Sequence, residues 1–133
     1  MVIKAGTIVI KDDLIAMIYR DYYDDYTFPK GHLEIGETIL ECAIRETEEE
    51  TKISVEILDK NPIYIQKYKN KNDELCKCTY YLAKYKGKSD NKSLEVHDLI
   101  WINFEDVYDK LTFDSDKVLW NSISDVVKKY MVK

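Results

Sequence analysis

The sequence lacks any apolar run long enough to form a membrane-spanning helix. Its 133 residues are 45% hydrophobic and 34% charged, proportions that are typical of a soluble globular protein. Residues 1–10, interrupted by Lys4 and Gly6, are too short and too polar for the apolar region of a signal peptide. We therefore predict a cytoplasmic protein that does not associate with membranes.

Cysteine, proline and glycine are scarce as well. With two prolines, four glycines and no internal repeat, the chain shows no linker, and its length predicts one compact domain over residues 1–133. The three cysteines, Cys42, Cys76 and Cys78, are an odd number in a chain without an export signal, which favours free thiols over disulfides. No second Cys or His pair accompanies Cys76 and Cys78, so the sequence does not predict a zinc site.

Basic residues are fewer than acidic ones, and nearly all of the basic residues are lysines. The net charge of −5 argues against binding to a nucleic-acid duplex, which requires a basic surface. A small anionic ligand held through a metal ion is compatible with this charge. Arginine occurs only at Arg20 and Arg45, and its use at Arg45 in a lysine-rich chain indicates a need for the planar fork of N–H donors.

The spacing of apolar residues predicts a mixed order of strands and helices. Strands are predicted at residues 2–10 and 14–19, which form a hairpin, and at residues 53–68, 74–85 and 100–102. Residues 21–27 are expected to form a polar loop. Helices are predicted at residues 38–51, where Thr38 and Glu41 match a capping box, and at residues 104–111 and 115–131.

Three carboxylates share one strip of the helix predicted at residues 38–51. Glu46, Glu49 and Glu50 stand at positions i, i+3 and i+4, a spacing at which like charges destabilise a helix by a few tenths of a kcal/mol per pair. A hard divalent cation with oxygen ligands would compensate for this repulsion. The alternative is a solvated acidic face, and the helix alone does not distinguish the two.

The flanking residues favour the metal site. The segment resembles the signature of Nudix hydrolases, G-x5-E-x7-R-E-U-x-E-E-x-G-U, in which U is bulky and apolar. Seven of its nine specified positions match, namely Gly31, Glu37, Arg45, Glu46, Glu49, Glu50 and Ile53. Thr47 replaces one apolar residue, and Lys52 replaces the glycine that ends the helix in a left-handed turn. We therefore expect the helix to end differently in this chain.

The resemblance implies an α/β/α sandwich around a mixed β-sheet, with the signature forming a loop-helix-loop unit at the sheet edge. It also implies that Mg²⁺ or Mn²⁺ binds to Glu46, Glu49, Glu50 and the backbone carbonyl of Lys30, and that water attacks phosphorus. Arg45 can reach Glu49 one helical turn away, and is expected to orient that carboxylate toward the metal.

A further carboxylate outside the signature is a candidate base or metal ligand. Many Nudix members carry a glutamate six residues before a tryptophan, and Glu95 stands six residues before Trp101. The alternative is an ordinary loop carboxylate, because the base differs in position across the family. The candidate catalytic residues are Glu49, Arg45 and Glu95.

Two short segments resemble the diadenosine tetraphosphate hydrolase branch of the family. They are Phe-Pro-Lys-Gly-His at residues 28–32 and Tyr-Tyr-Leu-Ala-Lys at residues 80–84. Lys30 and His32 are expected to contact a polyphosphate, although a solvent lysine and a turn histidine are equally compatible with the sequence. The residues expected to contact the substrate are Lys30, His32, Arg20 and Tyr81.

The function implied by the resemblance is hydrolysis of a nucleoside diphosphate linked to another moiety, with a diadenosine polyphosphate as the first candidate. The alternatives are a MutT-like nucleoside triphosphate pyrophosphohydrolase and an ADP-ribose pyrophosphatase. A nucleotide sensor without turnover is a different class, but such domains typically lose signature glutamates, which are all present here. The expected partner is a small nucleotide, and the chain is expected to be a monomer or a homodimer.

Overall fold

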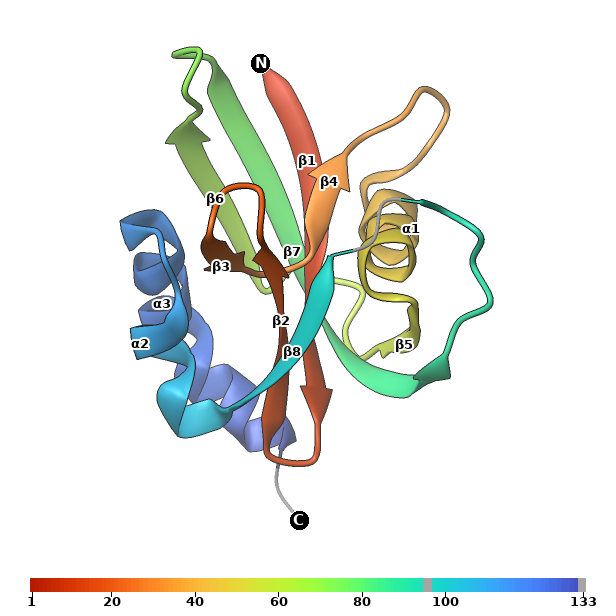
Figure 1. The fold of residues 1–133 in the computed structure, drawn as a ribbon, viewed down its shortest axis with the longest axis vertical. Helices are drawn as coiled ribbons and strands as arrows, with labels where there is room; N and C mark the ends of the chain where they lie inside the picture. The colour runs from red at the N-terminus through yellow and green to blue at the C-terminus, as the bar shows by residue number, and fades with distance from the viewer. Residues whose placement is uncertain (95–96, 132–133) are drawn as a thin grey trace.

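Eight strands form one β-sheet in the computed structural model, which describes residues 1–94 and 97–131 (Figure 1). The strands are β1 (Val2–Lys11), β2 (Leu14–Arg20), β3 (Asp25–Thr27), β4 (Lys30–His32), β5 (Ile53–Ile57), β6 (Tyr64–Lys69), β7 (Leu75–Lys88) and β8 (Asp98–Asn103). The helices are α1 (Ile39–Thr51), α2 (Val107–Lys110) and α3 (Asp114–Tyr130), and a 3-10 turn, η1 (Phe104–Asp106), precedes α2.

The sheet is mixed, as predicted. Its main order is β3-β2-β1-β7-β5, with β1 parallel to β7 and the neighbouring pairs antiparallel. β4 also pairs with β1, β8 pairs with β2, and β6 pairs with β7. The predicted hairpin of the first two strands is confirmed: Lys11 lies opposite Leu14, and Asp12 in the turn has a φ of 55°.

Helices cover both faces of the sheet, which confirms the α/β/α sandwich. α1 lies on one side of the strands, and α2 and α3 lie on the other (Figure 1). α1 packs mainly on β1, a central strand, so the expectation that the signature helix lies at the sheet edge is wrong. In the part of the chain that the structure describes, no helix is both long and apolar enough to cross a membrane.

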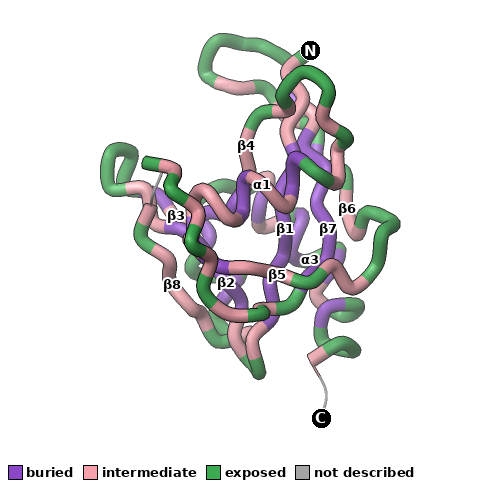
Figure 2. The backbone as a smooth tube through the Cα atoms, turned by 90° about the vertical axis from the view of Figure 1, so that its right-hand side faces the viewer, coloured by how far each residue is buried: buried purple, intermediate pink, exposed green. Residues whose placement is uncertain are grey.

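The main core lies between the sheet and α3, where the central strands are buried (Figure 2). Phe28, Tyr80 and Leu119 are among its fully buried side chains. A second cluster, which includes Ala5, Cys42 and Tyr81, fills the space between the sheet and α1. The three cysteines are buried free thiols, as predicted.

Two strand predictions need correction. Residues 53–68 form two strands instead of one, because Pro62 lies between β5 and β6 and cannot donate to a ladder. Both strands pair with the long β7 along different parts of its length. The predicted polar loop at residues 21–27 contains β3, whose three residues are too few to show a strand pattern in the sequence.

The ends of α1 are fixed by hydrogen bonds. Thr38 and Glu41 form the predicted capping box, with the Thr38 hydroxyl accepting from the Glu41 backbone at 3.1 Å. At the other end, Lys52 adopts the left-handed turn itself, with a φ of 59°, so the prediction of a different ending is wrong. The Lys52 ammonium donates to the carbonyl of Ser93, and the Ser89 N–H donates to the Lys52 carbonyl at 2.9 Å. These contacts hold a side chain where glycine is normally preferred.

We expect Lys52→Gly to be more stable than Lys52→Ala by about 1 kcal/mol, because both lose the ammonium contact but only alanine retains the left-handed strain. Urea unfolding followed by circular dichroism measures the difference. Equal stability of the two variants would show that the turn is not strained.

Candidate functional site

A small cavity lies where α1 meets the strands β1, β2 and β4. Its volume is about 140 Å³, and five of its nine lining residues are lysine, arginine or glutamate. The lining residues are Lys4, Ile18, Arg20, Thr27, Lys30, Gly31, His32, Glu46 and Glu50. Two larger hollows near Met131, of about 470 and 500 Å³, are lined by no residue of the signature. We therefore take the small cavity as the candidate site.

Gly31 is needed at its position because of Glu46. A Cβ atom on Gly31 would lie 2.0 Å from the Cδ atom of Glu46. The Glu46 carboxylate therefore rests against the bare backbone of β4, where it is almost fully buried. This close approach gives the first glycine of the signature a physical role in placing one of its acids.

Arg45 gathers the acids of the signature around one guanidinium. Its Nε and Nη2 donate to the two carboxylate oxygens of Glu37 at 2.5 and 3.0 Å. Its Nη1 donates to Glu46 at 3.0 Å and to Glu49 at 3.1 Å, so the predicted contact with Glu49 is confirmed. Nη2 also donates to the carbonyl of His32 at 2.9 Å, which ties α1 to β4.

The charges in this cluster alter each other's protonation. The hydrogen bonds from Arg45 hold the pKa of Glu37 below its usual value, and the same bonds raise the pKa of Arg45. One guanidinium thus contacts Glu37, Glu46 and Glu49, and cannot neutralise three carboxylates. The cluster keeps an excess of negative charge next to the cavity.

Glu50 joins the cavity to two other segments. Its Oε1 accepts from the backbone N–H of Lys30 at 2.9 Å, and its Oε2 lies 3.8 Å from the Nε2 atom of His97. The backbone N–H of His97 donates to the backbone carbonyl of Glu50 at 3.1 Å. No sequence motif marks His97, and only the fold brings it to the signature helix.

The acids are oxygen ligands of the type that a hard divalent cation prefers. Glu46 and Glu50 line the cavity, and Glu49 shares the Nη1 atom of Arg45 with Glu46. Over residues 1–94 and 97–131, no three His, Cys, Asp or Glu side chains converge as a ligand set. Arg45 holds Glu46 and Glu49, and the Lys30 N–H holds Glu50. The metal ligands, including the Lys30 carbonyl, therefore stay a prediction that the carboxylate chemistry favours.

Three cations face the acids from the strands. Arg20 makes a two-bond contact with Asp25 at 2.8 and 2.7 Å, and the Lys30 ammonium donates to Thr27 at 3.3 Å. The Lys4 ammonium donates to the hydroxyl of Tyr68 at 3.1 Å. Burial lowers the pKa of Lys4, and the nearby charges of Lys30 and Arg20 lower it further. Clustered cations of this kind favour an anionic ligand.

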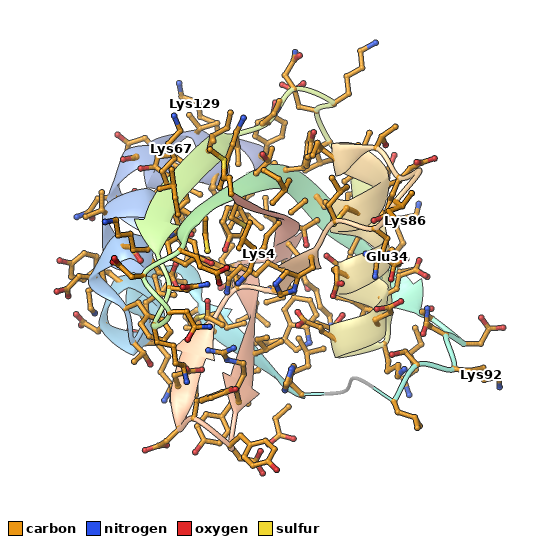
Figure 3. All side chains as sticks on the ribbon, turned by 90° about the horizontal axis from the view of Figure 1, so that it is seen from above. Lys4, Glu34, Lys67, Lys86, Lys92 and Lys129 are labelled. Carbon is orange, nitrogen blue, oxygen red and sulfur yellow. The ribbon has the colours of Figure 1, made fainter. Side chains whose placement is uncertain are left out.

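Seen from above, Lys4 lies near the middle of the molecule, and Glu34 lies on the side of α1 (Figure 3). The sequence analysis did not identify Lys4, because a single lysine in a strand carries no motif. The strand register places it opposite His32 on β4.

The remaining predicted residues have different positions. His32 is exposed and lines the cavity, and Ile53 is buried at the start of β5. Tyr81 does not line the cavity: it is buried under α1, where it packs with Ala5 and Ala43. Glu95 lies outside the described residues, so its role stays a prediction.

Comparisons with known proteins match most of the chain to one sequence family. The sequence model of the NUDIX domain matches residues 3–121. A curated relative, named "Probable DHNTP pyrophosphohydrolase", from Lactococcus lactis subsp. cremoris, is 34% identical over 76 residues, which are 54% of this chain and 46% of that protein. The match therefore spans less than half of that relative's length.

Solved structures resemble the fold over nearly the whole chain. An Ap4A hydrolase from C. elegans in a binary complex has a TM-score of 0.81 and 24% identity, covering 97% of this chain and 99% of that one. A MutT protein from Bacillus halodurans has a TM-score of 0.73 and 22% identity, covering 93% and 82%. At these identities the likeness establishes the fold.

We expect Gly31→Ala to weaken Mg²⁺ binding about 10-fold or more, because the new Cβ must displace the Glu46 carboxylate while the backbone stays in place. Calorimetric titration with MgCl₂ measures this. Gly87→Ala is the control, because its Cβ meets no atom within 4 Å, and the backbone strain from its positive φ of 122° arises on β7, at a residue that does not line the cavity. Unchanged Mg²⁺ affinity in Gly31→Ala would contradict the placement of Glu46 in a metal site.

We expect Glu37→Gln to be less stable than the unchanged chain at neutral pH, with the difference shrinking in acid. The folded-state pKa of Glu37 is lowered, so its stabilisation is complete above the unfolded-state value near 4.5 and is lost as the pH falls through the folded value. Urea unfolding at pH 7, 5, 4 and 3 tests this. Glu48→Gln, on the same helix, serves as the control, and a constant difference at all pH values would exclude the linkage.

Proposed function

The chain belongs to the Nudix family, and on that basis we propose that it hydrolyses a phosphoanhydride bond in a nucleoside diphosphate linked to another moiety. The observation that carries the proposal is one cavity in which Glu46 and Glu50 from α1 face Lys4, Arg20 and Lys30 from the strands. Acids that can hold a metal and cations that can hold phosphate are the two requirements of phosphoryl chemistry.

The cations would bind the phosphate chain. Arg20 uses two donors on Asp25, which fixes the plane of the guanidinium and leaves its other N–H groups for phosphate oxygens. The ammonium groups of Lys4 and Lys30 would bind further oxygens, and a phosphate between them would relieve their mutual repulsion.

The acids would bind Mg²⁺ or Mn²⁺. Glu46, Glu49 and Glu50 are the proposed side-chain ligands, and Arg45 would keep Glu49 oriented beside them. When bound, the ion would offset the charge of the phosphates and make water a better nucleophile. Arg45 and Glu37 remain paired in this scheme, so the guanidinium acts on the ligands and not on the substrate. Glu95 stays a candidate base.

A diadenosine polyphosphate such as Ap4A is the first substrate that we propose. Its support is the Phe-Pro-Lys-Gly-His segment at residues 28–32, together with three cations spread over three strands, which suit several consecutive phosphates. A nucleoside triphosphate is the second candidate, because the relative that shares 34% identity over 76 residues is named for DHNTP.

One screen separates these candidates. The purified chain with Mg²⁺ is incubated with Ap4A, nucleoside triphosphates, DHNTP and ADP-ribose, and the products are resolved by chromatography. We expect the highest kcat/KM for Ap4A. Preference for DHNTP or another triphosphate would overturn the substrate choice, and nucleotide binding without hydrolysis of any compound would identify a sensor and overturn the enzymatic proposal.

We expect Glu49→Gln and Glu50→Gln each to lower kcat by about 100-fold or more, because each removes a charge from the proposed metal site without changing size. Glu48→Gln makes the same change on the same helix, away from the cavity, and is expected to keep its activity. Thermal unfolding checks that all three variants fold. Full activity of Glu49→Gln and Glu50→Gln would refute the metal assignment.

A further inference from the structure

A buried carboxylate lies behind the cavity and plays no part in the signature. Asp116, in the first turn of α3, is 3% exposed. Its Oδ2 accepts from the Thr27 hydroxyl at 2.8 Å, and its Oδ1 accepts from the Gln66 amide at 2.8 Å. The start of a helix favours a negative charge, but burying a carboxylate still costs free energy unless hydrogen bonds compensate for lost water.

The bond to Asp116 determines how Thr27 is oriented. A threonine hydroxyl has one proton, and a carboxylate can only accept. Because Thr27 donates that proton to Asp116, its oxygen can offer only lone pairs to its other neighbours. The neighbour is the Lys30 ammonium, which donates to this oxygen at 3.3 Å. Thr27 and Lys30 both line the cavity.

Lys30 needs such an anchor because of its neighbours. Lys4 and Lys30 line the same cavity, and two like charges repel each other, which opposes holding the Lys30 ammonium inside it. An acceptor that cannot turn its proton toward Lys30 counteracts this repulsion.

We propose that Asp116 is a positioning residue for Lys30: through Thr27, it holds the Lys30 ammonium in the cavity, where it meets a phosphate of the ligand. The role of Lys30 rests on the proposed function, whereas the hydrogen-bonded series from Asp116 to Lys30 belongs to the fold. α3 thereby takes part in ligand binding without touching the ligand.

The experiment measures binding of inorganic tripolyphosphate by calorimetry without divalent ions, so that no turnover is needed. Thr27→Val removes the hydroxyl at nearly constant volume, and Asp116→Asn removes the charge. We expect each to weaken binding about fivefold, the size of one typical intramolecular hydrogen bond. Thr27→Ser keeps the hydroxyl and is expected to bind normally. Thr79→Val is the matched control, a buried threonine on β7 that does not line the cavity.

Double-mutant cycles with Lys30→Gln distinguish positioning from a general structural effect. If Thr27 and Asp116 act through Lys30, Thr27→Val and Asp116→Asn cause no further loss once Lys30 is replaced. Additive losses would overturn the proposal, and so would normal binding by both single variants or absence of binding by the unchanged chain. Thermal unfolding of every variant reports on the fold separately.

The outcome is independent of the substrate screen. Coupling between Lys30 and Asp116 together with failure of the screen would reject the proposed reaction and keep the positioning role. Hydrolysis in the screen without coupling between Lys30 and Asp116 would support the proposed reaction and reject the positioning role.

Discussion

The crowding of carboxylates around Arg45 is the constraint on which the site depends. A helix that presents several acids on one face is unfavourable by itself, and a single guanidinium offsets only part of their charge. The remaining repulsion is tolerated because α1 is held to β4 on both sides of Gly31: Arg45 donates to the His32 carbonyl, and Glu50 accepts from the Lys30 N–H. The backbone of β4 thereby holds the acidic face of α1 in place, although the carboxylates on that face repel one another.

The arrangement of the sheet explains why β4 lies next to α1. β1 is central, packs against α1 on one face, and pairs with β2, β4 and β7. The fourteen residues of β7 extend beyond β1, and they accept both β5 and β6 along the opposite edge. The cations therefore come from strands joined by one hydrogen-bonded network, and the acids come from the helix that rests on it. The geometry of the cavity is set by the pairing of β1 with β2 and β4 and by the packing of α1 on β1.

The spacing of residues close in sequence was enough to predict part of the structure. The capping box at Thr38, the first hairpin and the contact between Arg45 and Glu49 depend on residues close in sequence, where spacing alone fixes what can meet. Lys4 and Asp116 were missed, because their partners stand far away in the chain and no periodic pattern encodes such pairs. The prediction for the end of α1 was wrong for a related reason. A lysine disfavours the left-handed conformation, but contacts with Ser89 and Ser93, which are distant in sequence, hold Lys52 in it.

Lys30 connects the two chemistries of the cavity within one residue. Its backbone N–H belongs to the acidic side, through Glu50, while its ammonium belongs to the cationic side, through Thr27. Both groups belong to one residue, so the acidic and the cationic side of the cavity stay close together as long as the Lys30 ammonium remains on Thr27. A substitution that displaces the β4 backbone at Lys30 would therefore disturb the acidic and the cationic side of the cavity at the same time.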